Sequence, residues 1–208
     1  DLVRLQPGVF LNDELIEAGL RFLTNDLLNV QPWAAGDIFV FSSFFYSKLK
    51  GNNAGEPHKN LHRWTKRVNI FEKKYVLVPI NEDLHWYLLV VINPGHMLGG
   101  SVQTSTMKGK GVGLDAPPNG NGSTSCPATS TLILSMDSLG RRRPKVTKMI
   151  ESFLQSEATF REFSDCPSNA KGVHIPVPMQ PNLCDCGLYL LQNAKTFINN
   201  RETIVDSI

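Results

Sequence analysis

The sequence predicts an α+β or α/β fold in which helices cover one central sheet. Two runs, 86–92 (WYLLVVI) and 131–136 (TLILSM), are almost entirely apolar, which is typical of strands buried on both faces. Apolar residues also recur at intervals of three and four after Asn12 and after Lys145, which indicates amphipathic helices. The 208 residues are enough for one domain with a sizeable core, so we expect 1–208 to be a single domain.

The first half of the chain is expected to start with a helix at Asn12-Asp13, with Asp13 at or near the cap. Phe10 and Leu11 would pack on its first turn. The apolar face of this helix comprises Leu15, Ile16, Leu20, Leu23 and Leu27. The elements that follow are a strand at 37–41, a helix at 44–49, a polar loop at 51–60, a short basic helix at 64–71 and a strand at 75–80 whose end is marked by Pro79.

Residues 93–130 differ from the rest of the chain. They contain eight of the 16 glycines and four of the 13 prolines, with many Ser, Thr and Asn residues between them. Such a composition buries too little apolar surface to offset the entropy lost on ordering. We therefore predict a flexible insertion inside the domain, because strand patterns stand on both sides of it.

The second half continues with the strand at 131–136, which Asp137 ends. A helix is expected from about Lys145 to Phe163, with an apolar face of Val146, Ile150, Phe153 and Leu154. A short strand at 173–177 and a last helix at 186–199 complete the order.

Composition excludes several classes of protein. The net charge of +2 gives no case for nucleic-acid binding, which usually needs a strong basic excess. No apolar run reaches the ~18 residues of a membrane span, and the first residues lack a secretory signal pattern. Because the chain begins with Asp1, we expect it to be part of a longer protein. The basic residues at 66–74 and the run Arg141 to Arg143 are interpreted as solvated faces.

The chain has four cysteines, at positions 126, 166, 184 and 186. Their number and spacing fit a reducing compartment better than a disulfide scaffold. Cys184 and Cys186 lack a second pair at zinc-finger spacing, so neither a metal nor another cofactor is predicted.

The stretch 180–187 (QPNLCDCG) is the strongest candidate for a reactive site. Cys186 would stand at the start of the last helix, where unpaired N–H groups and the helix dipole favour a thiolate, the attacking form of cysteine. The alternative is that Cys186 is a small buried apolar residue, as most free cysteines are.

Other residues of the chain could act with Cys186. His85 precedes one buried strand and Asp137 follows the next, so an imidazole could take the cysteine proton while a carboxylate orients the ring. Gln180 could donate to a developing oxyanion, and Trp86 could wall a narrow substrate channel. The alternatives are a surface histidine, a loop-capping aspartate, an exposed glutamine and a core tryptophan.

The chain resembles the Ulp/SENP cysteine proteases, which remove the small ubiquitin-like modifier SUMO from proteins. The resemblance runs from Leu5 to about Phe197 and rests on motifs that occur in order. These are 10–13 (FLND), 44–46 (FFY), 78–80 (VPI), His85-Trp86, 136–139 (MDSL) and Gln180 through Cys186-Gly187.

The resemblance implies a papain-like cysteine protease fold of the Ulp type, with a central mixed sheet flanked by helices. It implies a triad of Cys186, His85 and Asp137, with Gln180 at the oxyanion. It also implies a tunnel for the Gly-Gly tail of the modifier, with Trp86 and Phe10 as its walls. Phe10 stands where many members of the family have a tryptophan. The resemblance further implies that Asp13 pairs with a basic residue of the modifier.

Within the family the chain is most similar to the chain-editing branch, the second Ulp and its animal relatives. The features that favour this branch are Phe10, the segments 43–46, 64–72 and 189–192, and the insertion at 93–130. The expected partners are therefore SUMO, SUMO-conjugated proteins and poly-SUMO chains, and the resemblance further implies a nuclear address. We expect a monomeric catalytic domain.

Three other functions stay open at this point. The same triad could act on another ubiquitin-like modifier, or it could transfer acetyl groups, as some relatives do. A third possibility is a SUMO-binding module without catalysis, although the joint presence of His85, Asp137, Gln180 and Cys186 argues against it.

Overall fold

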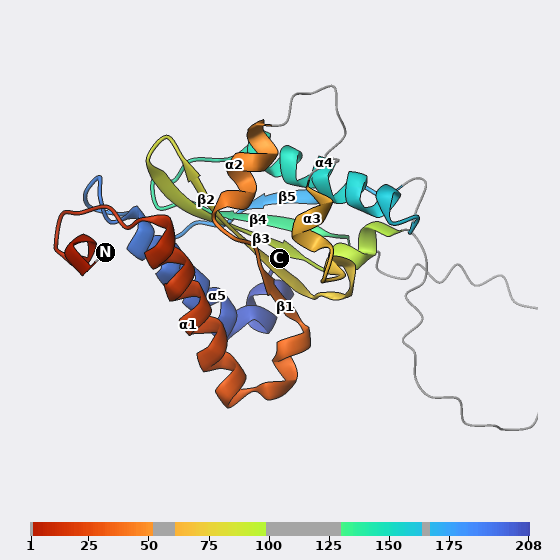
Figure 1. The fold of residues 1–208 in the computed structure, drawn as a ribbon, viewed down its shortest axis with the longest axis horizontal. Coiled ribbons are helices and arrows are strands. Elements are labelled where there is room, and N and C mark those ends of the chain that lie inside the picture. The colour runs from red at the N-terminus through yellow and green to blue at the C-terminus, as the bar shows by residue number, and fades with distance from the viewer. Residues whose placement is uncertain (1, 52–60, 99–129, 164–166) are drawn as a thin grey trace, which may run out of the picture.

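A computed structural model describes residues 2–51, 61–98, 130–163 and 167–208, and a five-stranded sheet lies at its centre (Figure 1). The strands lie side by side in the order of the sequence: β1 (Ile38–Val40), β2 (Tyr75–Glu82), β3 (His85–Ile92), β4 (Leu132–Met136) and β5 (Lys171–His174). β2, β3 and β4 are antiparallel neighbours, whereas β1 and β5 run parallel to the strands beside them. This mixed sheet with helices confirms the predicted fold class.

Helices cover both faces of the sheet. One layer holds α1 (Asp13–Val30) and α5 (Cys186–Asp206), and the opposite layer holds α2 (Phe44–Gly51), α3 (His62–Thr65) and α4 (Pro144–Phe160) (Figure 1). A short 3-10 helix, η1 (Leu2–Leu5), precedes α1, and three others, η2 (Pro32–Gly36), η3 (Ile70–Glu72) and η4 (Pro94–Leu98), lie in the connections between elements. The two layers explain why β3 is buried at every position, since its alternate side chains meet a different layer.

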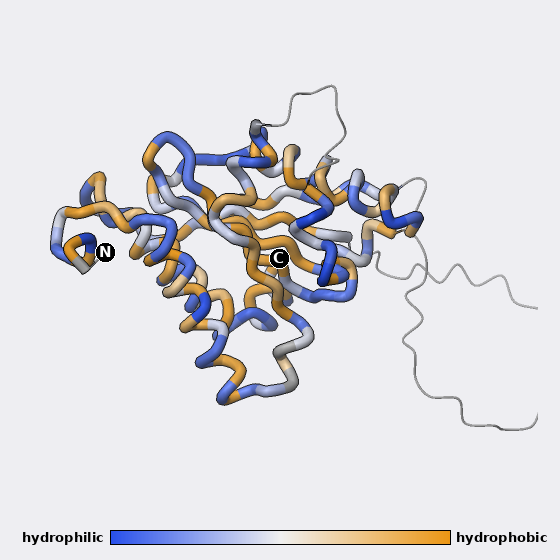
Figure 2. Tube along the Cα trace, in the orientation of Figure 1, coloured by the Kyte–Doolittle hydropathy of each residue, from blue (hydrophilic) through white to orange (hydrophobic). Residues whose placement is uncertain are grey.

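The side chains of β3 divide between two apolar clusters. Trp86, Leu88 and Val90 pack with α1 and α5, while Tyr87 and Leu89 pack with α2 and α4. The apolar character of the strands at the centre is visible in Figure 2. A run such as WYLLVVI is therefore a strand with two apolar faces, as predicted.

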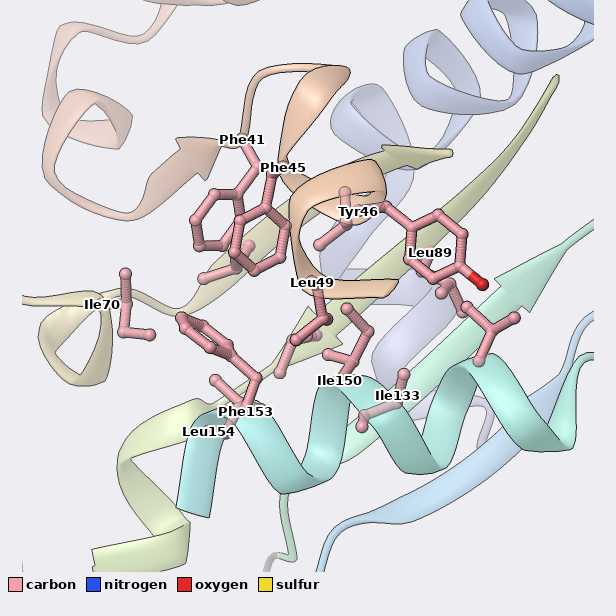
Figure 3. Packing of buried hydrophobic residues seen from close by; sticks show 14 of the residues in the cluster. Phe41, Phe45, Tyr46, Leu49, Ile70, Leu89, Ile133, Ile150, Phe153 and Leu154 are labelled. Carbon is pink, nitrogen blue, oxygen red and sulfur yellow. The ribbon is translucent and has the colours of Figure 1, made fainter. Parts of the chain in front are cut away.

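Aromatic rings fill the space between α2 and α4. The ring of Phe41 stacks on Phe45 with centroids 3.9 Å apart, and Phe45 meets Phe153 edge-on at 4.9 Å (Figure 3). These rings are buried and sit against the strands, so the aromatic-rich segment predicted as a helix is anchored by the core.

The predicted helix at 64–71 is wrong. The structure has α3 at His62–Thr65 and then a separate turn, η3 at Ile70–Glu72. Asn69 separates them because its side chain accepts a hydrogen bond from the N–H of Phe71 and so starts a new turn.

Two strand boundaries also differ from the prediction. β2 continues past Pro79 to Glu82, which is possible because β1 pairs only with Tyr75–Leu77. The Leu77 carbonyl faces β1, and alternation directs position 79 to the same side, beyond the end of β1. β5 lies at Lys171–His174 and not at 173–177, because its register with β4 ends at the pairing of His174 with Ser135, one residue before β4 itself ends.

The predicted insertion begins too early in the chain. η4 occupies Pro94–Leu98, and Met97 is fully buried in the core. Gly95 lies so close to the Phe71 carbonyl oxygen that a Cβ would stand 2.5 Å from it. Residues 99–129, which carry the rest of that prediction, and 52–60, which carry most of the predicted polar loop, lie outside the described residues.

A tight hairpin joins β2 to β3 and places two titratable residues, Glu82 and His85, at one end of the sheet. Glu82 and His85 are opposite each other, and the two residues between them, Asp83 and Leu84, both have positive φ. Such a two-residue turn matches the twist of the strands, although side chains other than glycine adopt it at a cost. The hairpin brings Glu82 and His85 to the edge where β4 ends.

Candidate active site

Cys186 is the first residue of α5 and is fully buried beside the start of α1. The next residue, Gly187, lies so close to α1 that a Cβ there would stand 3.0 Å from Leu11 and 3.2 Å from Ile16. Glycine at this position therefore lets the first turn of α5 approach the FLND segment. The N-terminus of α5 faces the end of the sheet that carries the β2–β3 hairpin.

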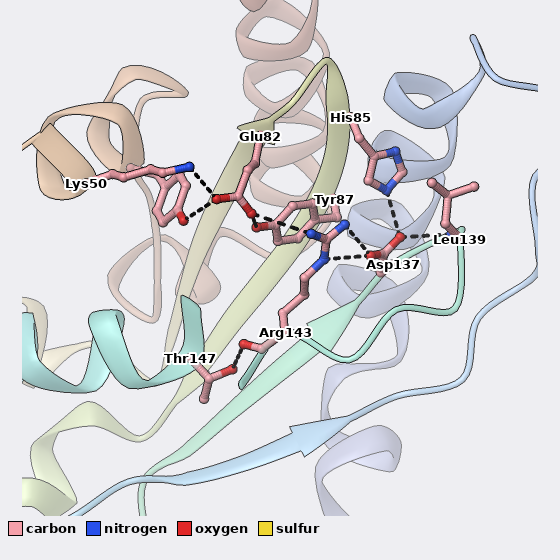
Figure 4. A network of polar contacts seen from close by, with 9 residues as sticks. Lys50, Glu82, His85, Tyr87, Asp137, Leu139, Arg143 and Thr147 are labelled. Carbon is pink, nitrogen blue, oxygen red and sulfur yellow. Dashed lines mark hydrogen bonds and ion pairs between the residues drawn. The ribbon is translucent and has the colours of Figure 1, made fainter. Parts of the chain in front are cut away.

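His85 and Asp137 meet because β3 and β4 are antiparallel neighbours. Leu88 pairs with Met136, so the start of β3 and the residue after β4 stand at the same end of the sheet. The Nε2 atom of His85 lies 2.7 Å from Oδ1 of Asp137 (Figure 4). The structure thus brings together the two residues that the strand pattern suggested as partners.

Asp137 is fully buried and receives several donors. Oδ1 accepts the His85 contact and a 2.8 Å hydrogen bond from the N–H of Leu139, while Oδ2 accepts from Nε of Arg143 at 2.8 Å. Burial alone would raise the pKa of Asp137, but these hydrogen bonds and the Arg143 charge outweigh it and lower that pKa below 3.8. Asp137 is therefore an anion that holds one ring nitrogen of His85.

His85 also interacts with Cys186, and the two groups favour each other's charged forms. Burial lowers the pKa of His85, but hydrogen bonds to Asp137 and Cys186 raise it above 6.5 overall. Burial raises the pKa of the Cys186 thiol, but the hydrogen bond to His85 and the backbone N–H groups of Trp86 and Gly187 lower it below 9.0 overall. The arrangement can therefore hold a thiolate beside an imidazolium.

The side chain of Gln180 is fixed at both ends of its amide. Its Oε1 accepts a 2.6 Å hydrogen bond from the Ser138 hydroxyl, and its Nε2 donates at 2.6 Å to the carbonyl of Asn182. A carbonyl can only accept, so the amide nitrogen must face Asn182. Gln180 is also tied through its backbone N–H to the Ser138 carbonyl at 3.0 Å.

The loop that leads into Cys186 is organised by Asn182. Its Oδ1 accepts from the N–H groups of Cys184 and Asp185 at 3.0 and 2.9 Å, and its Nδ2 donates to the Asp185 carboxylate. Cys184 is a partly exposed free thiol whose sulfur also contacts Asn182. Asparagine after proline is a turn signature, and the sequence interpretation did not use it.

The three residues predicted to bind substrate lie around the start of α1. Trp86 is 1% exposed, and its indole N–H donates to the Leu11 carbonyl at 2.9 Å. Phe10, which directly precedes Leu11, is 39% exposed. Asp13, partly exposed, is the first residue of α1, and Asn12 supplies the cap by accepting from the N–H of Leu15. Trp86 thus lies beneath the FLND segment, and Phe10 lies on its surface.

Two residues near the site were missed by the sequence interpretation. Ser138 follows Asp137 directly and holds Gln180, so adjacent positions after β4 support both His85 and Gln180. Arg143 was interpreted as part of a solvated run, but only Arg141 and Arg142 are exposed, whereas Arg143 is largely buried against Asp137. A polar residue after a strand-ending aspartate pointed to Ser138, but nothing in the run of arginines distinguished Arg143.

Among the residues that the structure describes, no helix is both long and apolar enough for a membrane span, and no group of three or more His, Cys, Asp or Glu side chains could hold a metal ion.

Comparison with known families and curated proteins gives consistent results. The Ulp1 protease family, C-terminal catalytic domain, matches residues 9–207. Ubiquitin-like-specific protease 2 of Schizosaccharomyces pombe is 32% identical over 211 residues, covering 99% of this chain and 33% of that protein. Sentrin-specific protease 7 of Mus musculus is 30% identical over 245 residues, covering 96% of this chain and 23% of that protein. The chain thus spans a third or less of the length of these relatives.

Solved structures agree on the fold. A crystal structure of a de-sumoylating protease matches with a TM-score of 0.74 at 24% identity, covering 95% of this chain and 65% of that one. The C-terminal Ulp1 protease domain, solved in complex with Smt3, the yeast ortholog of SUMO, matches with a TM-score of 0.59 at 20% identity, covering 94% of this chain and 69% of that one.

Proposed function

The chain belongs to the Ulp1 protease family, and on that premise we propose that it is a SUMO-specific isopeptidase that cleaves after the C-terminal Gly-Gly of SUMO. The names of its relatives support this substrate class, since they include ubiquitin-like-specific and sentrin-specific proteases. The likeness in fold to a protease domain solved with Smt3 also supports it. We further propose that residues 1–208 act as one monomeric catalytic domain.

One observation carries the chemistry of the proposal. The imidazole of His85 lies between the Asp137 carboxylate and the Cys186 sulfur, with Nε2 engaged by Asp137. The other ring nitrogen, Nδ1, would therefore exchange a proton with the sulfur. This is the arrangement that a cysteine nucleophile, its base and an orienting carboxylate require.

The proposed reaction proceeds in two halves. The Cys186 thiolate attacks the carbonyl carbon of the last glycine, and the oxygen takes the negative charge. When the tetrahedral intermediate collapses, the carbon–nitrogen bond breaks, and the imidazolium of His85 gives its proton to the leaving lysine amine. The thioester is then hydrolysed by a water that loses its proton to His85, which releases the SUMO carboxylate and restores the thiol proton to the Cys–His pair.

Gln180 is proposed to stabilise the oxyanion. One N–H of its amide donates to Asn182, and an amide nitrogen carries a second N–H that can face the substrate oxygen. Ser138 and Asn182 hold the amide in place, so little reorganisation is needed when charge develops.

The substrate tail is proposed to pass over the segment that Trp86 supports. Phe10 would cover the glycine backbone, and Trp86 would form the wall through its position beneath Leu11. A tail held between the Phe10 ring and the segment that Trp86 supports would have no room for a side chain larger than hydrogen, which would account for a Gly-Gly requirement. Asp13 would pair with a basic residue on the body of the modifier, which supplies binding energy away from the cleaved bond.

The finer assignments are proposals that follow from the resemblance to the chain-editing branch. We propose a preference for poly-SUMO chains over SUMO precursors, and a nuclear site of action.

The test is incubation of the protein with poly-SUMO chains and with a SUMO precursor, beside the Cys186→Ser variant. We expect the wild type to disassemble chains faster than it matures the precursor, and the variant to do neither. Parallel reactions with ubiquitin and other ubiquitin-like tail probes address the alternative modifiers. If one of those probes is cleaved as fast as SUMO or faster, the assignment of SUMO as the specific substrate is contradicted. If Cys186→Ser keeps its activity, the proposed mechanism is contradicted.

A further inference from the structure

We propose that Arg143 is a positioning residue for the candidate triad, because it holds the Asp137 carboxylate in the orientation and charge state that aligns His85. The inference rests on the proposed function for the reaction, but the state of the Cys186 thiol tests it without any modifier substrate.

Arg143 contacts one oxygen of the Asp137 carboxylate, and His85 contacts the other. Its Nε donates to Oδ2 at 2.8 Å, and its Nη2 forms an ion-pair contact of 2.8 Å with the same oxygen (Figure 4). The other oxygen, Oδ1, is thereby left for His85 and the N–H of Leu139. Rotation of the carboxylate would break contacts on both sides, so the oxygen that faces the imidazole is fixed.

Arg143 is itself held by its place in the fold. It is the N-cap of α4, and the following Pro144 restricts its backbone. Its carbonyl accepts hydrogen bonds from the N–H and the hydroxyl of Thr147, at 2.9 and 3.0 Å. Its guanidinium lies 4.1 Å from the ring centroid of Tyr87, and that ring also lies beside His85.

A second carboxylate completes the surroundings of Arg143. Oε2 of Glu82, from β2, lies 3.5 Å from Nη1 of Arg143 and accepts at 3.1 Å from the Tyr87 hydroxyl. Oε1 of Glu82 accepts from the Tyr46 hydroxyl at 3.0 Å and from Lys50 at 2.7 Å, both from α2. The hairpin, α2 and the start of α4 thus fix the guanidinium between two carboxylates, and only one of these touches His85 (Figure 4).

The charge of Arg143 matters because Asp137 is fully buried. Burial raises the pKa of Asp137, and the Arg143 cation is one of the groups that bring it down. Loss of that cation is therefore expected to raise the pKa of Asp137. A protonated Asp137 cannot stabilise the imidazolium of His85, so the Cys186 proton would return to sulfur.

The test is the pH dependence of Cys186 alkylation by iodoacetamide, measured in a background where Cys126, Cys166 and Cys184 are serine. The variants are Arg143→Gln, Arg143→Lys and Arg142→Gln. Arg142 is the matched control, because it is the exposed neighbour of Arg143 with the same charge. We expect Arg143→Gln to move the acid limb of the alkylation rate to higher pH, and Arg142→Gln to leave it in place. Arg143→Lys keeps a charge near Asp137, so its limb should stay close to that of the wild type.

Cleavage of the proposed substrate provides the second measurement. Arg143→Gln should lower kcat roughly ten- to hundredfold with little change in KM, as expected on losing a charge-assisted hydrogen bond that aligns the reacting groups. Arg143→Lys should lower kcat less, because it keeps the charge and loses the planar fork.

A purely structural role for Arg143 would lower the melting temperature and leave the alkylation profile of the folded protein unchanged. Coincident profiles for Arg143→Gln and Arg142→Gln would overturn the proposal. If Arg143→Gln does not fold, Arg143→Lys is compared with Arg142→Lys, and equal kcat values for that pair would overturn it as well. An altered alkylation profile without SUMO cleavage would support the role of Arg143 while contradicting the proposed substrate.

Discussion

At the scale of single residues, Cys186 and His85 are coupled through their charges. The pKa of Cys186 lies below its ordinary value of 9.0, and the pKa of His85 lies above its ordinary value of 6.5. The thiolate forms as pH rises through the lowered cysteine pKa, and the imidazolium is lost as pH rises through the raised histidine pKa. Both shifts therefore favour the thiolate–imidazolium pair over the neutral thiol and imidazole.

This coupling predicts the reactivity of the thiol. Wild-type Cys186 should react with iodoacetamide at pH values below 9.0. In His85→Ala the rise of the rate should move toward or above pH 9.0, because burial raises the cysteine pKa and the hydrogen bond from His85 that lowers it is lost. The rate is followed by mass spectrometry in the background where Cys126, Cys166 and Cys184 are serine, so that Cys186 is the remaining cysteine. His174→Ala is the control, since His174 lies at the end of β5. Identical profiles for His85→Ala and wild type would contradict the coupling.

Gln180 gives a second prediction at this scale. Gln180→Ala removes the proposed oxyanion donor and should lower kcat about a hundredfold or more, with a smaller effect on KM. Steady-state cleavage of a SUMO-derived fluorogenic substrate measures both constants. Gln192→Ala, an exposed glutamine on α5, should behave as wild type. A Gln180→Ala enzyme with unchanged kcat would remove Gln180 from the mechanism.

Part of the candidate site could be predicted from residue types and from their positions at the ends of predicted strands. His85 and Asp137 stand where buried strands begin and end, so their pairing could be predicted from sequence. The role of Arg143 could not be predicted, because it carries the same side chain as Arg141 and Arg142. Its contact with Asp137 depends on its place as the N-cap of α4, directly before Pro144. The support that Ser138 gives to Gln180 depends on a contact across 42 positions, which no local pattern contains.

At the scale of elements, a buried glutamate links α3 to α4. Glu157 is fully buried in α4 and accepts hydrogen bonds from the hydroxyl of Thr65 at 2.6 Å and from Nε of Arg161 at 2.5 Å. It also contacts Nδ1 of His62, and Nη2 of Arg161 donates to the Val68 carbonyl at 3.1 Å. Burial raises the pKa of Glu157, but these donors outweigh it and the pKa is lowered. The short α3 is therefore held by this polar cluster as well as by apolar packing.

Replacement of this carboxylate should destabilise the fold. Glu157→Gln keeps the shape but removes the charge that Arg161 faces, and should lower the free energy of unfolding by about 1–3 kcal/mol. Urea denaturation followed by circular dichroism measures the change. Glu162→Gln, at an exposed position just after α4, should change stability by less than about 0.5 kcal/mol. Equal midpoints for the two variants would contradict a stabilising role for Glu157.

Periodicity predicted the long elements better than the short ones. The apolar runs of β3 and β4 and the stripes of α1 and α4 reflect burial that repeats over many residues, so the pattern is strong. The short α3 and β5 were misplaced because their limits depend on single contacts. Asn69 starts a new turn after α3, and pairing with β4 ends β5 at His174 despite the apolar residues beyond it.

At the scale of the whole molecule, buried and partly buried carboxylates set the response to acid. The pKa values of Glu17, Glu82, Asp137 and Glu157 are all lowered by their hydrogen bonds and charged partners, against the effect of burial. A lowered pKa in the folded state contributes stability that is present above the unfolded pKa and is lost as pH falls through the folded one. Stability should therefore decrease below about pH 4.5, the ordinary value for glutamate.

Denaturation midpoints measured from pH 7 to pH 2.5 test this expectation. The wild type should lose stability progressively below about pH 4.5. The difference between wild type and Glu157→Gln should shrink over the same range, because the wild-type carboxylate becomes neutral too. A constant difference down to pH 2.5 would show that Glu157 does not contribute through its charge.

The convergence of the site is a property of the whole fold. His85, Asp137 and Cys186 are spread over about a hundred positions, and their approach depends on strand order, on the β2–β3 hairpin and on the close contact of Gly187 with α1. Composition and spacing contain none of these relations, so the sequence predicted this convergence mainly through its resemblance to a family.

The most direct test of the central claim is to locate the covalent adduct formed with an electrophilic probe. SUMO ending in a vinyl sulfone is incubated with the wild type and with His85→Ala, and the modified peptide is identified by tandem mass spectrometry. We predict one adduct, on the sulfur of Cys186, which forms far more slowly in His85→Ala. An adduct on Cys184, or none on the wild type, would contradict the assignment of Cys186 as the nucleophile that His85 activates.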